Sequence, residues 1–361
     1  MRNALLAFSI AVVAFVPSHA RGDDTEVVES VVEDDIAPTI TVFEAGDVKL
    51  TLGGLVQIHV APYVGDDALV ADDDPATREG FRLRRARFGI DGQFPHDLEL
   101  LLVLNPLVSD PESGAISEAR LSWSFRPWLR LAVGADKVPF TRGELASSAA
   151  LDTIERPLTT ETLVPQRRLG AVVEGLLFER LSYVLGVMNA TEGYELGNRF
   201  AGFLGVARLQ LDLVAGGLGL SVGTGGFYED GPASNTVAGS ADLRVSLAGA
   251  SLMVEGLCDQ ITPDDAPATS PDVEDQITRC GYYGQLSFRF GKYSIEPVAR
   301  VEWFDDNTGL DDAGDALLVS AGVNARPHAN LRLQLFYLGR YERESNERAN
   351  DSVILNLQGQ F

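Results

Sequence analysis

Four arginines fall within one short stretch of the chain, Phe81–Phe94, which reads FRLRRARFGIDGQF. They are Arg82, Arg84, Arg85 and Arg87. A guanidinium group stays charged at any physiological pH and presents a planar fork of donors, so such a cluster suits the binding of oxyanions. Apolar residues alternate with polar ones on both sides of the cluster, and this pattern predicts a β-strand with one apolar face and one cationic face.

The apolar phase of this stretch slips by one residue at its centre. Leu83 and Ala86 are three positions apart, whereas residues on one face of a strand are two apart. A β-bulge at Arg84–Arg85 would absorb the extra residue and let both arginines point to the same face. We therefore predict that the four arginines share the polar face of the strand.

The same period of two recurs along the rest of the chain. About sixteen strands are expected, most of them near the length of about 9–11 residues that a tilted strand needs to cross a bilayer. Their expected ranges are 48–61, 80–93, 98–104, 119–125, 129–135, 168–178, 181–189, 200–213, 217–228, 237–247, 250–259, 281–290, 292–304, 316–325, 330–343 and 352–361. Short connections alternate with long ones between these ranges. The fold class predicted from this pattern is an all-β, transmembrane, antiparallel up-and-down β-barrel.

A membrane barrel also explains the two faces of the strands. Closure of a barrel satisfies every backbone polar group at bilayer depth, where no water is available. The apolar face would meet lipid and the polar face would meet a wet interior. The chain ends at Phe361, and a terminal aromatic residue is typical of outer-membrane barrels.

The N-terminus carries the pattern of a secretory signal peptide. A short basic start precedes the apolar run Ala4–Val16, and Ser18–Ala20 places small residues at the two positions that determine cleavage. A single membrane anchor is the alternative, but the apolar run is short for a span. We expect residues 1–20 to be removed on export to the outer membrane of a Gram-negative-type cell. Residues 21–47 form an acidic tail, predicted as a short helix or a disordered segment, and residues 48–361 form the barrel.

The charge balance excludes nucleic acid as a partner. The formal net charge is −23, whereas nucleic-acid-binding proteins present basic faces. The acidic residues crowd into predicted loops such as Asp72–Asp74 and Asp311–Asp312, and the arginines lie in predicted strands. Two consequences of the acidic loops stay open, namely attraction of divalent cations and repulsion of neighbouring acidic surfaces. Arginines deep in a pore would still dominate ion passage, because exposed charge is screened within about 8 Å at physiological ionic strength.

The two cysteines, Cys258 and Cys280, flank one predicted loop. In an exported protein this arrangement predicts a disulfide, which would stabilise the fold by about 3 kcal/mol. No histidine lies near either cysteine, so we expect no metal site there, and no cofactor elsewhere. Catalysis is not expected either, because the four histidines cannot be placed by spacing in a Ser/His/acid set on one wall.

Several spaced pieces of the chain resemble one known family, the phosphate-selective porins O and P. The pieces are RRARFGIDGQF (Arg84–Phe94), EARLSWSF (Glu118–Phe125), LRLAVGADKVPF (Leu129–Phe140), ALDTIERPL (Ala150–Leu158) and RRLG (Arg167–Gly170). The resemblance implies a 16-stranded barrel, usually a homotrimer, with a long loop folded into the lumen, here residues 138–167. It also implies arginines that descend the wall and a lysine cluster at the constriction. Lys137 falls at the lysine-containing end of the fifth strand, but only two other lysines occur, Lys49 and Lys292.

Strand phase and resemblance together give the candidate site residues. The predicted pore-lining anion contacts are Arg82, Arg84, Arg85, Arg87, Arg120, Arg130, Lys137 and Arg168, and the predicted constriction-loop residues are Arg142, Glu155, Arg156 and Arg167. By phase, Arg208, Arg244, Arg289, Arg300 and Arg332 also face the interior. The alternative for any single arginine is that it pairs with an interior carboxylate and braces the barrel. The candidate partners are Asp91, Glu99, Glu118, Asp136, Glu174, Asp212 and Glu296.

The function predicted from these features is passive diffusion of small anions, including phosphate or polyphosphate, through an arginine-lined, water-filled pore. The expected partners are outer-membrane lipid and small anionic solutes. Two alternatives stay open: a general-diffusion or cation-tolerant porin without phosphate selectivity, and a non-conducting structural barrel. The second would have an interior plugged by bulky apolar side chains, whereas the predicted inward set is polar.

Overall fold

The computed structural model describes residues 40–65, 79–107, 116–165, 167–190, 200–264, 276–291, 294–310, 315–342 and 349–361. Within these ranges the chain forms one 17-stranded sheet. The strands are β1 (Ile40–Ala45), β2 (Val48–Val64), β3 (Gly80–Phe94), β4 (Leu98–Leu104), β5 (Ile116–Arg126), β6 (Leu129–Asp136), β7 (Arg168–Leu177), β8 (Leu181–Asn189), β9 (Phe203–Ala215), β10 (Leu218–Asp230), β11 (Ser234–Leu247), β12 (Ala250–Pro263), β13 (Ile277–Phe288), β14 (Ile295–Asp305), β15 (Ala316–His328), β16 (Leu331–Glu342) and β17 (Ser352–Gln360).

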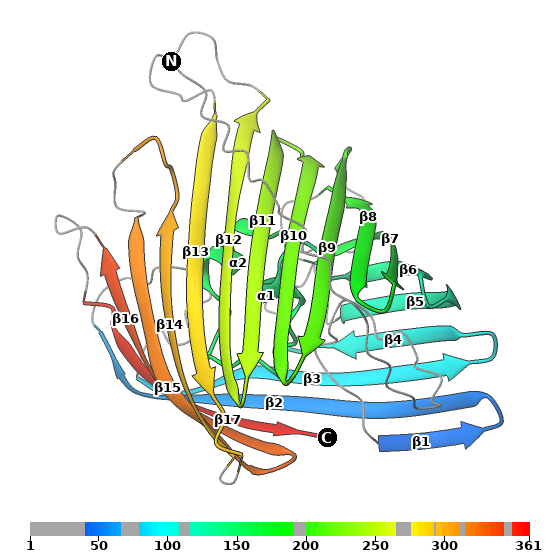
Figure 1. Cartoon of the computed structure of the whole chain (residues 1–361), viewed down its shortest axis with the longest axis horizontal. Helices are drawn as coiled ribbons and strands as arrows, with labels where there is room; N and C mark the ends of the chain where they lie inside the picture. The colour runs from blue at the N-terminus through cyan, green and yellow to red at the C-terminus, as the bar shows by residue number, and fades with distance from the viewer. Residues whose placement is uncertain are drawn as a thin grey trace.

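Sixteen of the strands close into a barrel (Figure 1). Each strand from β2 to β16 pairs antiparallel with the next strand along the chain. The last strand, β17, pairs back onto β2, with Gln358 opposite Gln57. Closure removes the free edges of an open sheet, which explains how so many short strands form one stable unit. The predicted fold class is confirmed.

The remaining strand, β1, lies outside this ring and corrects one prediction. The acidic segment 21–47 was expected to be a short helix or a disordered tail, but Ile40–Ala45 forms a strand that pairs with the first residues of β2. The β-branched and aromatic residues of ITVFEA favour a strand, and Gly46 takes the left-handed conformation (φ 58°) that a tight turn requires. The predicted signal peptide, residues 1–20, and the acidic loop residues Asp72–Asp74 and Asp311–Asp312 lie outside the described residues.

The connections differ at the two ends of the barrel. At one end, the connections that join β3 to β4, β5 to β6 and each following pair up to β15 and β16 are short. We call this end of the barrel the short-turn end. Gly216 and Gly217, between β9 and β10, both have positive φ, which matches the twist of a two-residue hairpin. At the opposite end, where long connections were predicted, one connection is short. β10 and β11 are joined only by residues 231–233, where the Gly231 N–H donates to the Ser234 carbonyl and closes a tight turn.

The two faces of the strands separate as predicted. In β14, Glu296, Arg300 and Glu302 are buried inside the barrel, whereas Ile295 and Val301 are exposed outside it. The same alternation holds in β16 and β17. The outer wall is therefore a largely apolar surface. None of the described helices has the length and hydropathy of a transmembrane helix.

The connection between β6 and β7 contains the helices α1 (Arg142–Leu145) and α2 (Leu158–Leu163). We call residues 137–165 the internal segment, because its contacts go to inward side chains of strands all round the barrel, as detailed below. Val138 and Phe140 are fully buried and belong to an apolar cluster with inward residues of β6–β12 and β14. In Figure 1, α1 and α2 are seen behind β11–β13.

Candidate functional site

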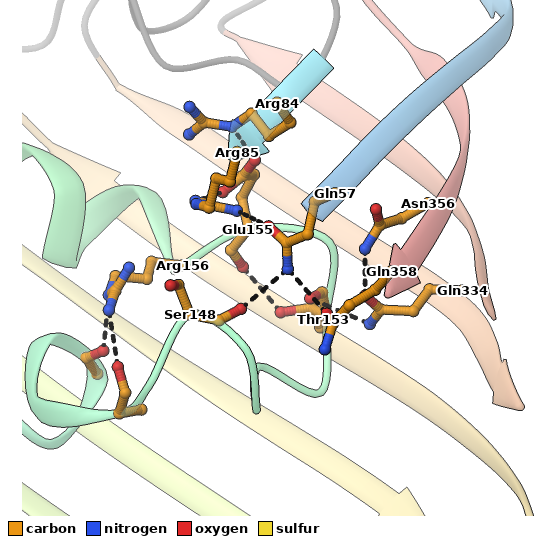
Figure 2. A network of polar contacts seen from close by, with 12 residues as sticks. Gln57, Arg84, Arg85, Ser148, Thr153, Glu155, Arg156, Gln334, Asn356 and Gln358 are labelled. Atoms are coloured by element: carbon orange, nitrogen blue, oxygen red, sulfur yellow. Dashed lines mark hydrogen bonds and ion pairs between the residues drawn. The ribbon is translucent and has the colours of Figure 1, made fainter. Parts of the chain in front are cut away.

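The arginines of β3 contact the internal segment through one carboxylate. Gln57 of β2 pairs with Arg85 and the next residue, Ile58, pairs with Leu83, so Arg84 is the extra residue of a bulge. The predicted bulge is confirmed, and it lets both arginines reach Glu155 (Figure 2). Arg84 Nε lies 2.5 Å from Glu155 Oε1, and Arg85 Nη2 lies 2.5 Å from Oε2.

The same strand holds the segment at a second point, Ser148. Arg85 Nη1 donates to Gln57 Oε1 (2.8 Å), and Gln57 Nε2 donates to the Ser148 carbonyl (3.1 Å). Arg87 Nη1 donates to the Ser148 hydroxyl. Arg82 lies opposite His59 in the β2–β3 pairing. Arg84, Arg85 and Arg87 thus contact the internal segment.

Neutral amide side chains hold the stretch between these two points. Gln358 Nε2 donates to the Ala149 carbonyl (2.9 Å) and Asn324 Nδ2 to the Asp152 carbonyl (2.8 Å). Gln334 Nε2 donates to the carbonyls of Leu151 (3.3 Å) and Thr153 (3.4 Å). With Gln57 these residues form what we call the amide row, which crosses β15, β16, β17 and β2. Successive backbone carbonyls of an otherwise irregular stretch therefore have donors from the wall, as buried backbone groups require.

Two wall carboxylates satisfy the helix starts of the segment. The first backbone N–H groups of a helix have no intrahelical acceptor. Glu255 of β12 accepts from the N–H groups of Arg142 (2.6 Å) and Gly143 (3.0 Å), and Glu302 of β14 accepts from Leu158 N–H (2.7 Å). Both carboxylates are at most 1% exposed. Both helices are thus held by the barrel wall.

Most other inward cations are paired with carboxylates or carbonyls. Arg120 contacts Asp136 (2.7 Å), and Arg130 contacts Glu99 (2.5 Å) and Glu174 (2.9 Å). The remaining predicted site residues have similar partners: Lys137 donates to the carbonyls of Leu145 and Ala146, Arg142 pairs with Asp242, Arg156 with Glu144, Arg167 with Glu118, and Arg168 with Glu229. These contacts match the bracing alternative. The role of the same side chains as anion contacts stays a prediction.

A cavity of about 340 Å³ lies between the internal segment and the wall at the short-turn end. Of the residues that the structure describes, five arginines line it, namely Arg142, Arg244, Arg289, Arg300 and Arg326, and Asp152 is the single acidic one. Behind the lining, Asp242, Glu302 and Glu296 pair with four of these arginines. Arg244 instead donates to the Ser251 hydroxyl (3.3 Å). Arg208 also pairs with Asp242, and Glu255 accepts from the N–H groups of Arg142 and Gly143, so six cations face five carboxylates around the cavity among the described residues.

Strand phase anticipated part of this cavity. It placed Arg244, Arg289 and Arg300 inside the barrel, but it treated Arg326 as a residue of a short turn. The structure shows an irregular register between Ala325 and His328, which lets Arg326 reach the cavity. The amide row was not proposed as a site either. Its only sequence signal is the inward phase of β16 and β17.

The predicted disulfide is present. Cys258 and Cys280 are bonded and lie directly opposite each other on β12 and β13. Both strands continue past the cysteines, to Pro263 and from Ile277, so the bond joins two paired strands and not only the base of a loop.

A closed sixteen-stranded antiparallel barrel with a polar, charged interior and an apolar outer wall has the architecture of a porin. Solved structures agree with this class. An anion-selective porin from Comamonas acidovorans superposes with a TM-score of 0.61 at 14% sequence identity, over 87% of this chain and 100% of that one. The outer membrane channel DcaP of Acinetobacter baumannii gives a TM-score of 0.60 at 11% identity, over 90% and 100% of the two chains. OmpF of Salmonella typhi gives 0.58 at 13% identity, over 87% and 98%.

At the level of sequence, residues 56–209 match the family described as phosphate-selective porin O and P. This range contains all five pieces, from Arg84 to Gly170, on which the resemblance was based, so the resemblance is confirmed there. A search of curated protein sequences gives no significant match.

Proposed function

We propose that this chain is an outer-membrane porin that lets small anions diffuse passively through the barrel. The observation that carries the proposal is the arginine-lined cavity at the short-turn end. Among the described residues its walls hold five arginines and one aspartate, and the guanidinium of Arg244 donates to the Ser251 hydroxyl and forms no ion pair within 4 Å. An anion entering this space would meet several donors whose charge is only partly neutralised.

Physical chemistry favours anions over cations at such a place. A cleft with low-dielectric walls and an excess of one sign of charge raises the local concentration of the opposite ion. Conduction also requires that each site be weak enough for the ion to leave. The carboxylates Glu296 and Asp242, which already neutralise part of the arginine charge, keep each site weak in this sense.

The finer parts of the proposal concern export, assembly and cargo. We propose cleavage of the signal peptide after Ala20, assembly as a homotrimer, and short turns on the periplasmic side. Phosphate is the proposed cargo on the strength of the family match. Lys137, the lysine that fits the family's constriction, is only 1% exposed and donates to two backbone carbonyls. The arginines are therefore the proposed solute contacts.

Conductance across a planar bilayer tests the proposal, with chloride and phosphate compared. We expect ion current with anion preference for the wild-type protein. The double variant Arg244→Gln, Arg326→Gln should lower that preference, because it removes two charges from the cavity wall. Arg126→Gln is the matched control, since Arg126 is exposed at the end of β5 and donates to the neighbouring Phe125 carbonyl. Absence of current would overturn the porin assignment, and cation preference would overturn its anion part.

A further inference from the structure

Two glycines of the inner wall lie directly against the internal segment. They are Gly225, on β10, and Gly281, on β13. Each lies two positions before a buried inward residue, Phe227 and Tyr283 respectively, so both glycines have the inward phase of their strands. A side chain at either position would therefore point into the lumen, at the place that the internal segment already occupies.

Gly225 lies against the backbone of Phe140. The Phe140 carbonyl oxygen accepts from Ser240 Oγ (3.1 Å) and from Arg208 Nη1 (3.4 Å). Gly225 lies between these two donors, because it pairs with Arg208 of β9 on one side and with Ser240 of β11 on the other. A Cβ atom on Gly225 would overlap the same carbonyl oxygen. The carbonyl thus fills the space that any other residue type at position 225 would need.

Gly281 lies against the side chain of Thr159, in α2. A Cβ atom on Gly281 would lie 2.5 Å from Thr159 Oγ1 and 2.6 Å from Thr159 Cγ2, whereas ordinary van der Waals contacts begin at 3.4 Å. Thr159 is fully buried and β-branched, so its side chain has little freedom to turn away. Glu302 fixes α2 at the same place, because it accepts from the Leu158 N–H (2.7 Å). A larger residue at position 281 would push α2 off the wall.

Both contacts bring the internal segment closer to the wall than a side chain would allow. In a close-packed interior an added methyl group displaces what it touches, because the voids are too small to absorb it. Restoring ordinary contact distances would move the segment by about 1 Å. The barrel encloses the segment, so this movement goes away from β10 and β13 and into the lumen.

We propose that Gly225 and Gly281 are positioning residues of the pore. Because they have no side chain, they let the internal segment lie against the wall, and they thereby set the width that is left for the solute. Gly225 acts through the Phe140 carbonyl and Gly281 through the Thr159 side chain. The proposal rests on the proposed function, since the width of the lumen matters only in a barrel that conducts.

The single-channel conductance in chloride, together with the largest neutral polyethylene glycol that enters the pore, tests the proposal. Gly225→Ala and Gly281→Ala should each lose conductance and admit only smaller polymers than the wild-type protein. Gly239→Ala and Gly284→Ala are the matched controls. Both of these glycines lie on the outer face, where a Cβ atom would have no contact within 4 Å among the described residues. The controls should leave conductance and polymer entry unchanged.

Thr159→Ala combined with Gly281→Ala tests the contact directly. The two changes move a methyl group from the segment to the wall, so the double variant should recover conductance and polymer entry toward those of the wild type. The Thr159 hydroxyl can be spared, because its Oγ1 has no hydrogen-bond partner among the described residues. A double variant that stays as narrow as Gly281→Ala would overturn the proposal.

The unfolding midpoint in detergent separates a change in pore width from a loss of stability. Suppose that Gly225→Ala and Gly281→Ala unfold earlier but keep the wild-type conductance and polymer entry. The glycines would then only stabilise the fold, and the proposal would be overturned. If Gly281→Ala alone does not fold, the double variant must fold and conduct for the proposal to stand. Absence of current from the wild-type barrel would instead refute the proposed function.

Discussion

Glu155→Gln is the substitution that most directly tests how the internal segment is held. The Glu155 carboxylate bridges two arginines of β3, with side-chain exposures of 13% for Arg84, 6% for Arg85 and 10% for Glu155. Removing one charge from a buried ion pair costs about 3–5 kcal/mol. Glutamine keeps one acceptor oxygen, so we expect the lower end, a loss of about 3 kcal/mol in the free energy of unfolding.

The same substitution should change ion selectivity, because it leaves the two arginines without their counter-charge. One unit charge acting over about 8 Å at an effective dielectric constant of about 20 contributes about 2 kcal/mol. The permeability ratio of anion to cation should therefore rise by about thirtyfold at that energy. Denaturant unfolding in detergent measures the stability, and the reversal potential of single channels measures the ratio.

Glu144→Gln is the matched control for this experiment. Glu144 also lies in the internal segment, but it contacts one arginine, Arg156, at 3.4 Å. The substitution Glu144→Gln removes the same formal charge as Glu155→Gln and should have a smaller effect on both stability and ion selectivity. Equal effects of the two substitutions, or no effect of Glu155→Gln, would refute the inference that the bridge from β3 holds the segment.

Three further predictions concern the anchors of the fold. Glu255→Ala should lower the free energy of unfolding by about 3 kcal/mol, because two buried backbone N–H groups at the start of α1 lose their acceptor. It should also increase current noise in bilayer recordings. An unchanged unfolding midpoint would contradict this prediction. Gln334→Leu should cost about 1–3 kcal/mol in the same unfolding assay, since the carbonyls of Leu151 and Thr153 lose a donor. The double variant Cys258→Ser, Cys280→Ser should lose about 3 kcal/mol with conductance unchanged, and a reductant should reproduce the loss in the wild-type protein.

The barrel could be predicted from the sequence because its signals are local. A period of two, turn residues and the phase slip between Leu83 and Ala86 lie within a few positions of one another, and the strands, faces and bulge followed from them. The disulfide followed from there being only two cysteines. β1 was missed because its six residues lie in an acidic segment. The connection between β10 and β11 was predicted too long, because strand pairing continues to Asp230 and Asn235.

The partners of the inward side chains could not be predicted, because they depend on the path of the internal segment. Arg85 and Glu155 are 70 positions apart in the sequence, and Gln358 and Ala149 are 209 positions apart. Strand phase says only that such side chains point inward. Packing across the whole barrel decides the partner of each arginine. Some arginines contact a carboxylate and others a carbonyl, and Arg332 keeps donors without a hydrogen-bond partner among the described residues.

The zero-current potential of the wild-type channel in a potassium chloride gradient tests the central claim most directly. A barrel whose short-turn end presents arginines in excess should give a potential with the sign of anion preference. That preference should weaken in the Arg244→Gln, Arg326→Gln variant and hold in Arg126→Gln. A potential with the sign of cation preference, or no measurable current, would contradict the account.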